Sequence, residues 1–352
     1  MKKLIFALLI APFLSFAQTY SGPESVDCDT TTGNWYISNT SSKKILRRTP
    51  DGTLQNFLSG FTNGPYGIEV VGDRIYACDG NKIKGFLLSD GTQVTTITTT
   101  ATFLNGITHD ASGLLYATDF SGKKVYKINP ANNTWNVFVP QTTSTPNGIL
   151  YDASQNRLVC VTWGASAKLL GISLADSTVS ILKTTSLSNI DGIARDGSGR
   201  WYVASWGANA IHRIESDFSG TPQQVYSGLS NPADIYYNLK NDTLAVPNAG
   251  NNTVVFINFA PVTPTTDVQV QVKLKSFPNP AMDEIWLELP SDWDVQMLHC
   301  RLFDANGRCF EPEVMDKNSR SCRIAMNNLM QGLYHARLTQ GEKSAYATFV
   351  KQ

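Results

Sequence analysis

The sequence predicts an all-β protein in which a six-bladed β-propeller is followed by a small β-sandwich domain. A short phrase ending in an aliphatic residue recurs six times, and the closing aliphatic residues are 42, 39, 42, 44 and 42 positions apart. A period of about 40 residues with strand-like content is typical of one four-stranded sheet per repeat, arranged around an axis. The repeat stops near Phe259. The segments that follow alternate apolar and polar residues and lack the recurring phrase. The six copies begin at Pro23, Pro65, Leu104, Pro146, Ile190 and Pro232.

Residues 1–17 have the pattern of a secretory signal peptide. Two lysines precede an apolar run over 4–16, and a Ser-Phe-Ala cleavage site ends at Ala17. The run is shorter than the roughly 20 residues that a membrane-spanning helix needs, and no later apolar run approaches that length. We therefore expect an exported protein without a transmembrane segment.

The charge balance argues against a nucleic-acid partner. Lys and Arg together number 29, Asp and Glu also number 29, and charged residues make up only 16% of the chain. No basic patch or acidic tail stands out along the sequence. The composition thus leaves small molecules and other proteins as the expected partners.

Each repeat within the predicted propeller, 18–259, has the same internal order. The phrase leads into a short strand, and a turn rich in Asp and Gly follows, as at 110–113 and 196–199. A second strand, a third such as 124–128, and a less regular fourth such as 135–139 complete the repeat. Because a strand, a tight turn and a returning strand bring the chain back to its starting end, the second residue of each phrase and the last residue of the second strand share one propeller face.

The remaining part of the chain divides into a linker and a second domain. Residues 260–271 are rich in Pro and Thr and read as an extended linker. Residues 272–352 contain half-buried strand patterns, for example at 284–289 and 333–338. These patterns predict the β-sandwich.

The cysteines are not arranged for a metal site. No C-x-x-C spacing suggests zinc. Three cysteines fall in each predicted domain, so pairing within both cannot be complete, although export permits disulfides. Cys300 and Cys309 flank a predicted hairpin turn. The propeller cysteines are expected to be small buried hydrophobic residues: Cys28, Cys78 and Cys160.

The second residues of the six phrases predict a metal site at the mouth of the central channel. They are Glu24, Tyr66, Asn105, Asn147, Asp191 and Ala233. Four carry side-chain oxygens, the ligands that Ca²⁺ prefers, and two of the four are carboxylates. The set has no His or Cys, which argues against zinc. We expect Ca²⁺, or another divalent cation, on the axis; turn chemistry is the alternative reason for Asn and Asp in such loops. The expected ligands are Glu24, Asn105, Asn147 and Asp191.

The repeats resemble the SMP-30/gluconolactonase family of six-bladed propellers. The likeness is carried by Asn147 in Pro-Asn-Gly-Ile and by Asp191 in Asp-Gly-Ile-Ala-Arg-Asp-Gly-Ser-Gly, and it covers residues 20–259. This family and its relative, squid-type diisopropylfluorophosphatase, hold calcium with a Glu from the first blade, Asn residues and an Asp. In this chain that ordered set is matched by Glu24, Asn105, Asn147 and Asp191. Single phrases also resemble NHL repeats, which often serve only as binding platforms.

The resemblance implies a lactone or ester hydrolase, with two departures from the family. Asp191 is implied as the general base for water. Gluconolactonase-like members usually carry an Arg two residues before the second-site Asn, whereas this chain has Phe103, and Gly106 stands where an Asp is frequent. Sugar-lactone specificity is therefore not expected. Apolar rim residues are the predicted substrate-binding set, either stacking on a ring-shaped ligand or filling the gaps between blades: Tyr66, Phe103, Phe120, Trp163 and Trp206.

The C-terminal domain resembles the type A sorting domain of the type IX secretion system of Bacteroidetes. Three phrases carry the likeness over about 276–352: Ser-Phe-Pro-Asn-Pro-Ala at 276–281, the turn-containing segment 302–308, and Leu-Met-Gln-Gly-Leu-Tyr at 329–334. The resemblance implies that the type IX machinery carries the protein across the outer membrane. The mature protein is then either secreted or attached to the cell surface.

Two functions remain open from the sequence. One is a calcium-dependent hydrolase of lactones or esters. The other is a noncatalytic propeller that binds a ligand or a protein partner at the cell surface. Glu24, Asn147 and Asp191 favour the hydrolase, whereas Phe103 and the absence of the arginine favour the binding platform.

Overall fold

The computed structural model is all-β, which confirms the predicted fold class. The chain divides into two compact units, with the division between Ala260 and Pro261. Residues 1–17 and 260–271 lie outside the described residues, and so do the signal-peptide and linker predictions. The structure describes residues 18–259 and 272–352 except for 292, 294–297, 305–308, 311, 313, 319, 328, 341 and 342.

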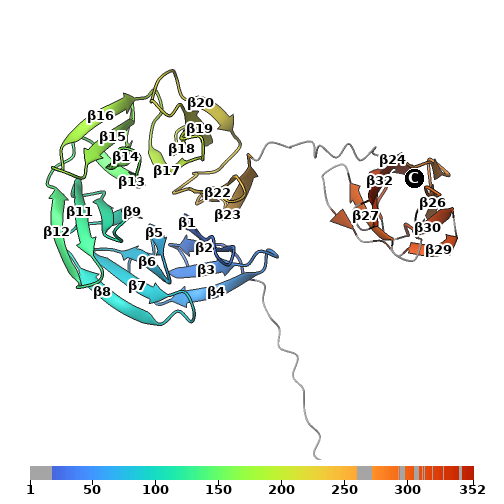
Figure 1. The fold of residues 1–352 in the computed structure, drawn as a ribbon, viewed down its shortest axis with the longest axis horizontal. Helices are drawn as coiled ribbons and strands as arrows, with labels where there is room; N and C mark the ends of the chain where they lie inside the picture. The colour runs from blue at the N-terminus through green and yellow to red at the C-terminus, as the bar shows by residue number, and fades with distance from the viewer. Residues whose placement is uncertain are drawn as a thin grey trace, which may run out of the picture. The chain divides into compact units, whose positions relative to one another are not determined.

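The first unit is a ring of six antiparallel sheets, and in each sheet the strands follow one another in sequence order. Figure 1 shows β1, β5, β9, β13 and β17 around the centre and β4, β8, β12, β16 and β20 at the periphery. Blades one to three consist of β1 (Pro23–Asp29), β2 (Asn34–Asn39), β3 (Lys44–Arg48) and β4 (Leu54–Ser59); β5 (Ile68–Val71), β6 (Arg74–Asp79), β7 (Lys82–Leu87) and β8 (Gln93–Thr98); and β9 (Leu104–His109), β10 (Leu115–Asp119), β11 (Lys124–Asn129) and β12 (Thr134–Val139). Blades four to six consist of β13 (Thr145–Asp152), β14 (Arg157–Trp163), β15 (Lys168–Ser173) and β16 (Val179–Thr184); β17 (Ile190–Arg195), β18 (Trp201–Ser205), β19 (Ala210–Ile214) and β20 (Gln223–Tyr226); and β21 (Tyr236–Asn238), β22 (Thr243–Asn248) and β23 (Thr253–Asn258).

Burial along each blade follows from its place between two neighbours. The second strands are almost continuously buried, as in β10 and β22, because adjacent blades cover both of their faces. The fourth strands, such as β8 and β16, alternate or are largely exposed because they form the outer edge. The apolar core therefore lies between blades rather than on the axis.

Glycine in the recurring phrase allows the inner strands to approach one another closely. A Cβ atom on Gly106 would lie 2.5 Å from the backbone oxygen of Asn147 in the next blade, and one on Gly148 would lie 2.4 Å from that of Asp191. Gly67 faces the backbone oxygen of Asn105 in the same way and donates its N–H to that oxygen at 3.0 Å. The third phrase position is thus a packing requirement between neighbouring blades.

The sixth blade differs from the prediction of four strands per repeat. Its sheet contains β21, β22 and β23, and no fourth strand joins it among the described residues. The ring closes by side-chain packing and local bonds instead. Trp35 packs edge-on against Phe256, Gly22 N–H donates to Asn252 Oδ1 at 2.7 Å, and Asp234 N–H donates to the Glu24 carbonyl at 2.8 Å.

The propeller cysteines behave as predicted. Cys28, Cys78 and Cys160 are buried free thiols in the packing between blades. Cys300 and Cys322 are also buried, in the second unit. Burial raises the pKa of the Cys28 and Cys160 thiols to about 12, so neither has thiolate character at neutral pH.

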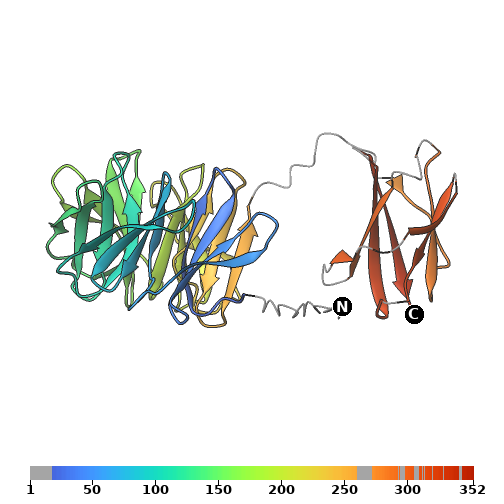
Figure 2. The same ribbon diagram turned by 90° about the horizontal axis from the view of Figure 1, so that it is seen from below.

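The second unit is a sandwich of two facing sheets, as predicted (Figure 2). Its core includes Ile285, Leu302, Ile324 and Phe349 from both sheets. The five-stranded sheet has the order β24 (Val272–Lys273), β32 (Lys343–Lys351), β31 (Gly332–Gln340), β27 (His299–Asp304) and β28 (Cys309–Phe310). The four-stranded sheet has the order β25 (Ser276–Phe277), β26 (Glu284–Glu288), β30 (Ser321–Ala325) and β29 (Val314–Asn318).

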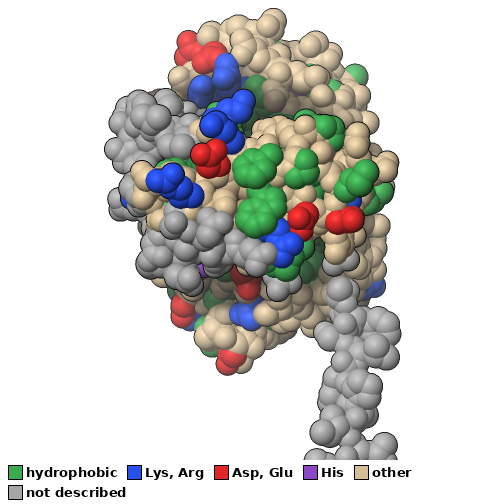
Figure 3. All heavy atoms as spheres, turned by 90° about the vertical axis from the view of Figure 1, so that its right-hand side faces the viewer, with side chains coloured by type: hydrophobic (Ala, Val, Ile, Leu, Met, Phe, Trp, Pro, Cys, Tyr) green, Lys and Arg blue, Asp and Glu red, His purple; other side chains and the backbone are tan. Residues whose placement is uncertain are grey.

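Hydrophobic side chains gather on a face of this second unit (Figure 3). Six large apolar residues of the unit are exposed by at least a third of their surface: Phe277, Met282, Met330, Leu333, Tyr346 and Val350.

Candidate functional site

The second residues of the phrases converge at one mouth of the propeller channel. Asn105 Nδ2 donates to Asn147 Oδ1 at 2.7 Å, so the amide groups of two neighbouring blades touch. Thr118 Oγ1 on β10 donates to the Asn147 carbonyl at 2.8 Å and fixes that inner strand. The structure therefore brings together side chains that are 42 residues apart in the chain.

Glu24 and Asp191 lie close enough to influence each other's ionisation. Burial, and then the charges of Glu24 and Asp234, raise the pKa of Asp191 well above its usual range. Interactions with the Trp206 indole and the Asn147 amide oppose that rise because they favour the carboxylate. Burial, followed by the charge of Asp234, raises the pKa of Glu24 to about 7.

Asp234 is a third carboxyl at this mouth, and the sequence reasoning missed it. Burial raises its pKa to about 7, while a hydrogen bond from Ser25 Oγ, 2.8 Å long, favours the ionised form. Ser25 and Asp234 occupy the phrase position that is glycine in blades two to five. That departure from the repeat is the pattern that could have revealed the residue.

The three carboxyls lack cationic side chains to neutralise them. Within the part of the chain that the structure describes, none of Glu24, Asp191 and Asp234 forms an ion pair with Lys or Arg. Burying carboxylates without a counter-charge destabilises the folded state. A bound divalent cation would supply that counter-charge.

The donor set suits calcium rather than a softer metal. Among the described residues, no three His, Cys, Asp or Glu side chains are grouped so that they could hold a metal ion. A site here depends on the two carboxylates Glu24 and Asp191 together with the amide oxygens of Asn105 and Asn147. Calcium accepts such mixed oxygen ligands and completes its shell with water, so the residues fit that ion.

Tyr66 and Ala233 complete the ring without joining the donor set. The pKa of Tyr66 is raised by burial and by the charge of Glu24, which places the tyrosine near that carboxyl. Ala233 is fully buried, and its N–H donates to the Pro247 carbonyl at 2.9 Å.

The five predicted substrate-binding residues form one continuous chain of aromatic rings. Neighbouring ring centroids are 4.5 Å apart for Tyr66 and Phe103, 5.9 Å for Phe103 and Phe120, 5.9 Å for Phe120 and Trp163, and 5.3 Å for Trp163 and Trp206. All four contacts are edge-to-face, the geometry that aromatic pairs favour. We call this set the aromatic arc; it runs across blades two to five on the same face as the ring of phrase residues.

Phe120, Trp163 and Trp206 occupy one repeat position, immediately after the residue that pairs with the first residue of the phrase. In blades two and three, the residue just before this position caps the loop that leads into the first strand. Asp79 Oδ1 accepts the N–H groups of Asn63 and Gly64 at 2.6 and 2.8 Å, and Asp119 accepts that of Phe103 at 2.9 Å. In blades four and five the capping position is occupied by Thr162 and Ser205, and Trp163 and Trp206, one residue later, are half-buried. The rim thus carries partly exposed apolar rings in blades three to five.

A cavity of 450 Å³ adjoins one end of the aromatic arc. Tyr66 and Phe103 line it together with loop residues that include Asn63 and Asn81. Its volume lies in the range of small-molecule sites.

The comparison with protein families identifies the second unit. Residues 275–352 match the model described as the secretion system C-terminal sorting domain. This match confirms the predicted sorting domain and implies export of the protein. The described residues include no helix that is long and apolar enough to span a membrane.

The comparison with solved structures shows the propeller fold. Virginiamycin B lyase from Staphylococcus aureus is 16% identical, with 68% of this chain and 84% of that chain covered and a TM-score of 0.52. The nidogen/laminin complex matches at 18% identity, 62% and 86% coverage and a TM-score of 0.55. A luciferin-regenerating enzyme matches at 14% identity, 66% and 85% coverage and a TM-score of 0.54. No curated protein matches the sequence.

The fold and the sorting domain together define the class of protein. It is an exported β-propeller that carries a C-terminal secretion sorting domain. Identities below a fifth relate the propeller to these structures by fold alone.

Proposed function

We propose that the propeller binds Ca²⁺, or another divalent cation, at its channel mouth and hydrolyses a lactone or ester there. Glu24, Asn105, Asn147 and Asp191 would hold the ion. The observation that carries the proposal is the convergence of mutually repelling carboxyls, buried at Asp191 and half-buried at Glu24, next to paired amide groups, with no Lys or Arg ion pair to the carboxyls among the described residues. A cation would remove this repulsion and compensate the burial.

Each residue of the site would have a separate role in hydrolysis. A bound cation would polarise the substrate carbonyl and stabilise negative charge on its oxygen. Asp191 would accept the proton of an attacking water at a carboxylate oxygen. Asn147 would orient Asp191, with which it interacts.

The aromatic arc would select an apolar or aromatic substrate. Phe103 packs between Tyr66 and Phe120 and offers no hydrogen-bond donor from its side chain. A polyhydroxylated sugar lactone would leave its hydroxyls unpaired against this wall, at a cost of about 1–3 kcal/mol for each buried group. A lactone or ester with an aryl or alkyl substituent matches the wall better.

The sorting domain would deliver the propeller to its place of action. We infer that residues 272–352 engage the type IX secretion machinery, consistent with the family match over 275–352. The propeller would then act outside the outer membrane, either released or attached to the surface.

Metal content and a substrate panel test the proposal. The purified chain, dialysed against a calcium buffer, should contain one bound calcium and hydrolyse aryl or alkyl lactones or esters until a chelator is added. Asp191→Asn should abolish hydrolysis. Asp90→Asn is a suitable control, because Asp90 lies in an exposed turn of blade two. Hydrolysis that persists in chelator, or in Asp191→Asn, would contradict the assigned site.

A binding platform is the second candidate function. A solved structure with the same fold is that of the nidogen/laminin complex, a protein assembly. In addition, the Asn105–Asn147 hydrogen bond pairs the two amides with each other, which is a stable arrangement without any metal. Calcium binding without turnover of any lactone or ester would favour this alternative.

A further inference from the structure

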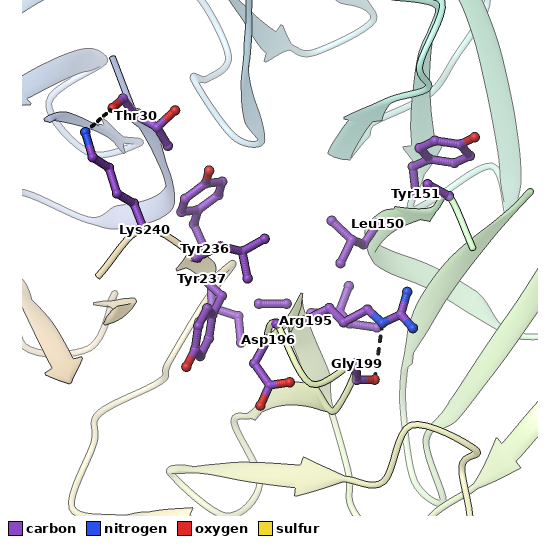
Figure 4. Close-up of a pocket in the computed structure, with 15 residues that line it drawn as sticks. Thr30, Leu150, Tyr151, Arg195, Asp196, Gly199, Tyr236, Tyr237 and Lys240 are labelled. Carbon is purple, nitrogen blue, oxygen red and sulfur yellow. Dashed lines mark hydrogen bonds between the residues drawn. The ribbon is translucent and has the colours of Figure 1, made fainter. Parts of the chain in front are cut away.

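A larger cavity lies at the opposite mouth of the propeller channel. Its volume is 720 Å³, and its walls come from blades four, five and six with a contribution from blade one. Figure 4 shows Leu150 and Tyr236 on opposite sides of this space. Leu150 lies three residues after Asn147, and Tyr236 three residues after Ala233, so the cavity is at the far end of the inner strands. The apolar wall includes Leu150, Ile193, Ala194, Ile235, Tyr236 and Leu239.

The cavity exists because a cross-blade hydrogen bond is confined to half of the ring. In blades one to three, the side chain three positions after the second phrase residue accepts a backbone N–H from the next blade. Asp27 accepts from Val70 at 2.6 Å, and Thr108 accepts from Tyr151 at 3.3 Å; Glu69 accepts similarly in blade two. In blades four and five this position is Leu150 and Ala194, which have no side-chain acceptor.

The missing acceptors make one half of this mouth apolar and open. Ala194 is small, and Leu239 at the rim is 60% exposed. A cavity of this volume with a mainly apolar wall is typical of a small-molecule site. Its position in the apolar half follows directly from the change of residue type at one repeat position.

The charges at the rim leave one cation without a carboxylate partner. Arg195 is paired with Asp152 at 2.6 Å, and Asp196 is paired with Arg200 at 2.7 Å, so those charges are compensated. Lys240 Nζ donates only to the Thr30 carbonyl, at 3.4 Å, among the bonds of the described residues (Figure 4).

Two acidic side chains lie on the deeper side of the mouth. The charges of Asp27 and Glu69 contribute to raising the pKa of Tyr236, so both carboxyls lie near that ring. Burial raises the pKa of Asp27 well above its usual range, and Glu69 pairs with His109 at 2.6 Å, so neither attracts an anionic head group, whereas Lys240 at the outer rim would attract it. A ligand is thereby oriented with its charge outward and its apolar part against Leu150 and Ala194.

We propose that this second mouth is a binding site for a small monocarboxylate with an apolar body. The apolar body occupies the wall formed by blades four to six, and the carboxylate lies at Lys240. The site is separate from the channel mouth that holds Glu24 and Asp191 and does not require calcium.

Three ligands with the same tail and different heads test the proposal. Octanoate, octanol and octylamine are titrated into the full-length chain by calorimetry at pH 7.5 in the presence of EDTA. Octanoate should bind most tightly, octanol more weakly and octylamine most weakly. The proposal is overturned if octanoate does not bind at millimolar concentration, or if octylamine binds as tightly as octanoate.

Two variants separate the contribution of the ligand's carboxylate from that of its apolar tail, and a third serves as a control. Lys240→Gln should weaken octanoate about fivefold, as expected for one exposed ion pair, and leave octanol unchanged. Lys275→Gln removes the same charge from the second unit, where the side chain is 83% exposed, and should change neither ligand. Ala194→Leu should abolish the binding of both octanoate and octanol, because the larger side chain fills the cavity. Octanoate binding that survives both Lys240→Gln and Ala194→Leu places the site elsewhere and refutes the assignment.

Discussion

The raised pKa values of the channel-mouth carboxyls predict that the stability of the propeller falls as pH rises. Bound calcium should cancel this loss of stability. The pKa of Glu24 rises from 4.5 to about 7 on folding. The folded state therefore binds more protons than the unfolded state between these values, and stability falls as pH rises through that window. A rise of this size corresponds to about 3 kcal/mol for a fully desolvated group. Glu24 is half-buried at the mouth, so solvent screening reduces the effect to about 2 kcal/mol.

Calorimetric melting in EDTA measures this effect. The propeller transition should lie roughly 4–8 °C lower at pH 8 than at pH 5, from the usual relation between stability and Tm for a domain of this size. Calcium should raise the transition at pH 8 and have little effect at pH 5, because protons compete for the same oxygens. Asp27, whose pKa is also raised by burial and by Glu69, lies away from the donor set and should leave a residual pH dependence.

Variants locate the effect. Glu24→Gln should remove part of the pH dependence and most of the calcium response. Asp73→Asn, at a side chain that is 81% exposed, should alter neither. A chain that is equally stable at pH 5 and pH 8 in EDTA would refute the electrostatic reasoning, and a calcium-insensitive transition at pH 8 would refute the metal site.

Three further predictions concern packing, sorting and the pair formed by His109 and Glu69. Gly148→Ala should lower the urea-unfolding free energy by about 1–3 kcal/mol because its Cβ would overlap the next blade, while Gly197→Ala, with nothing within 4 Å of its added Cβ, should change it by about 0.5 kcal/mol or less; equal effects would contradict the close-approach argument. Removal of residues 272–352 should leave a folded propeller in the periplasm, as judged by cell fractionation, and normal export of the truncated chain would refute the role of the sorting domain. A hydrogen bond to Glu69 raises the pKa of His109, so this pair stabilises the fold below pH 6.5 and loses its effect as pH rises through the folded pKa; Glu69→Gln should lower the His109 pKa in an NMR titration, and an unchanged value would contradict the pairing.

The propeller was predictable because one repeat position carries a strict packing rule. Gly67, Gly106, Gly148 and Gly192 are required by backbone contacts between neighbouring inner strands, and that requirement left a visible period in the chain. The sorting domain was predictable for a different reason, since its phrases resemble a known family and the family model matches them.

The three-stranded sixth blade was not predictable from the repeat. The phrase at Pro232 is present, but its residues do not indicate how the ring closes. Closure depends on contacts between blade one and blade six, such as Trp35 against Phe256 and Ser25 with Asp234. These residues are more than 200 positions apart, and no local pattern links them.

The sequence by itself determined the blade repeat, the identity of the oxygen-bearing residues at one position of it, and the presence of the C-terminal sorting domain, because each of these depends on local patterns of residue type. Only the tertiary structure decided that Asp234 joins Glu24 and Asp191, that five aromatic residues form one arc, and that the opposite mouth opens beside Ala194. The physical reason is that burial, charge repulsion and ring packing act through distances in space, and the closed ring brings distant segments of the chain within reach of one another.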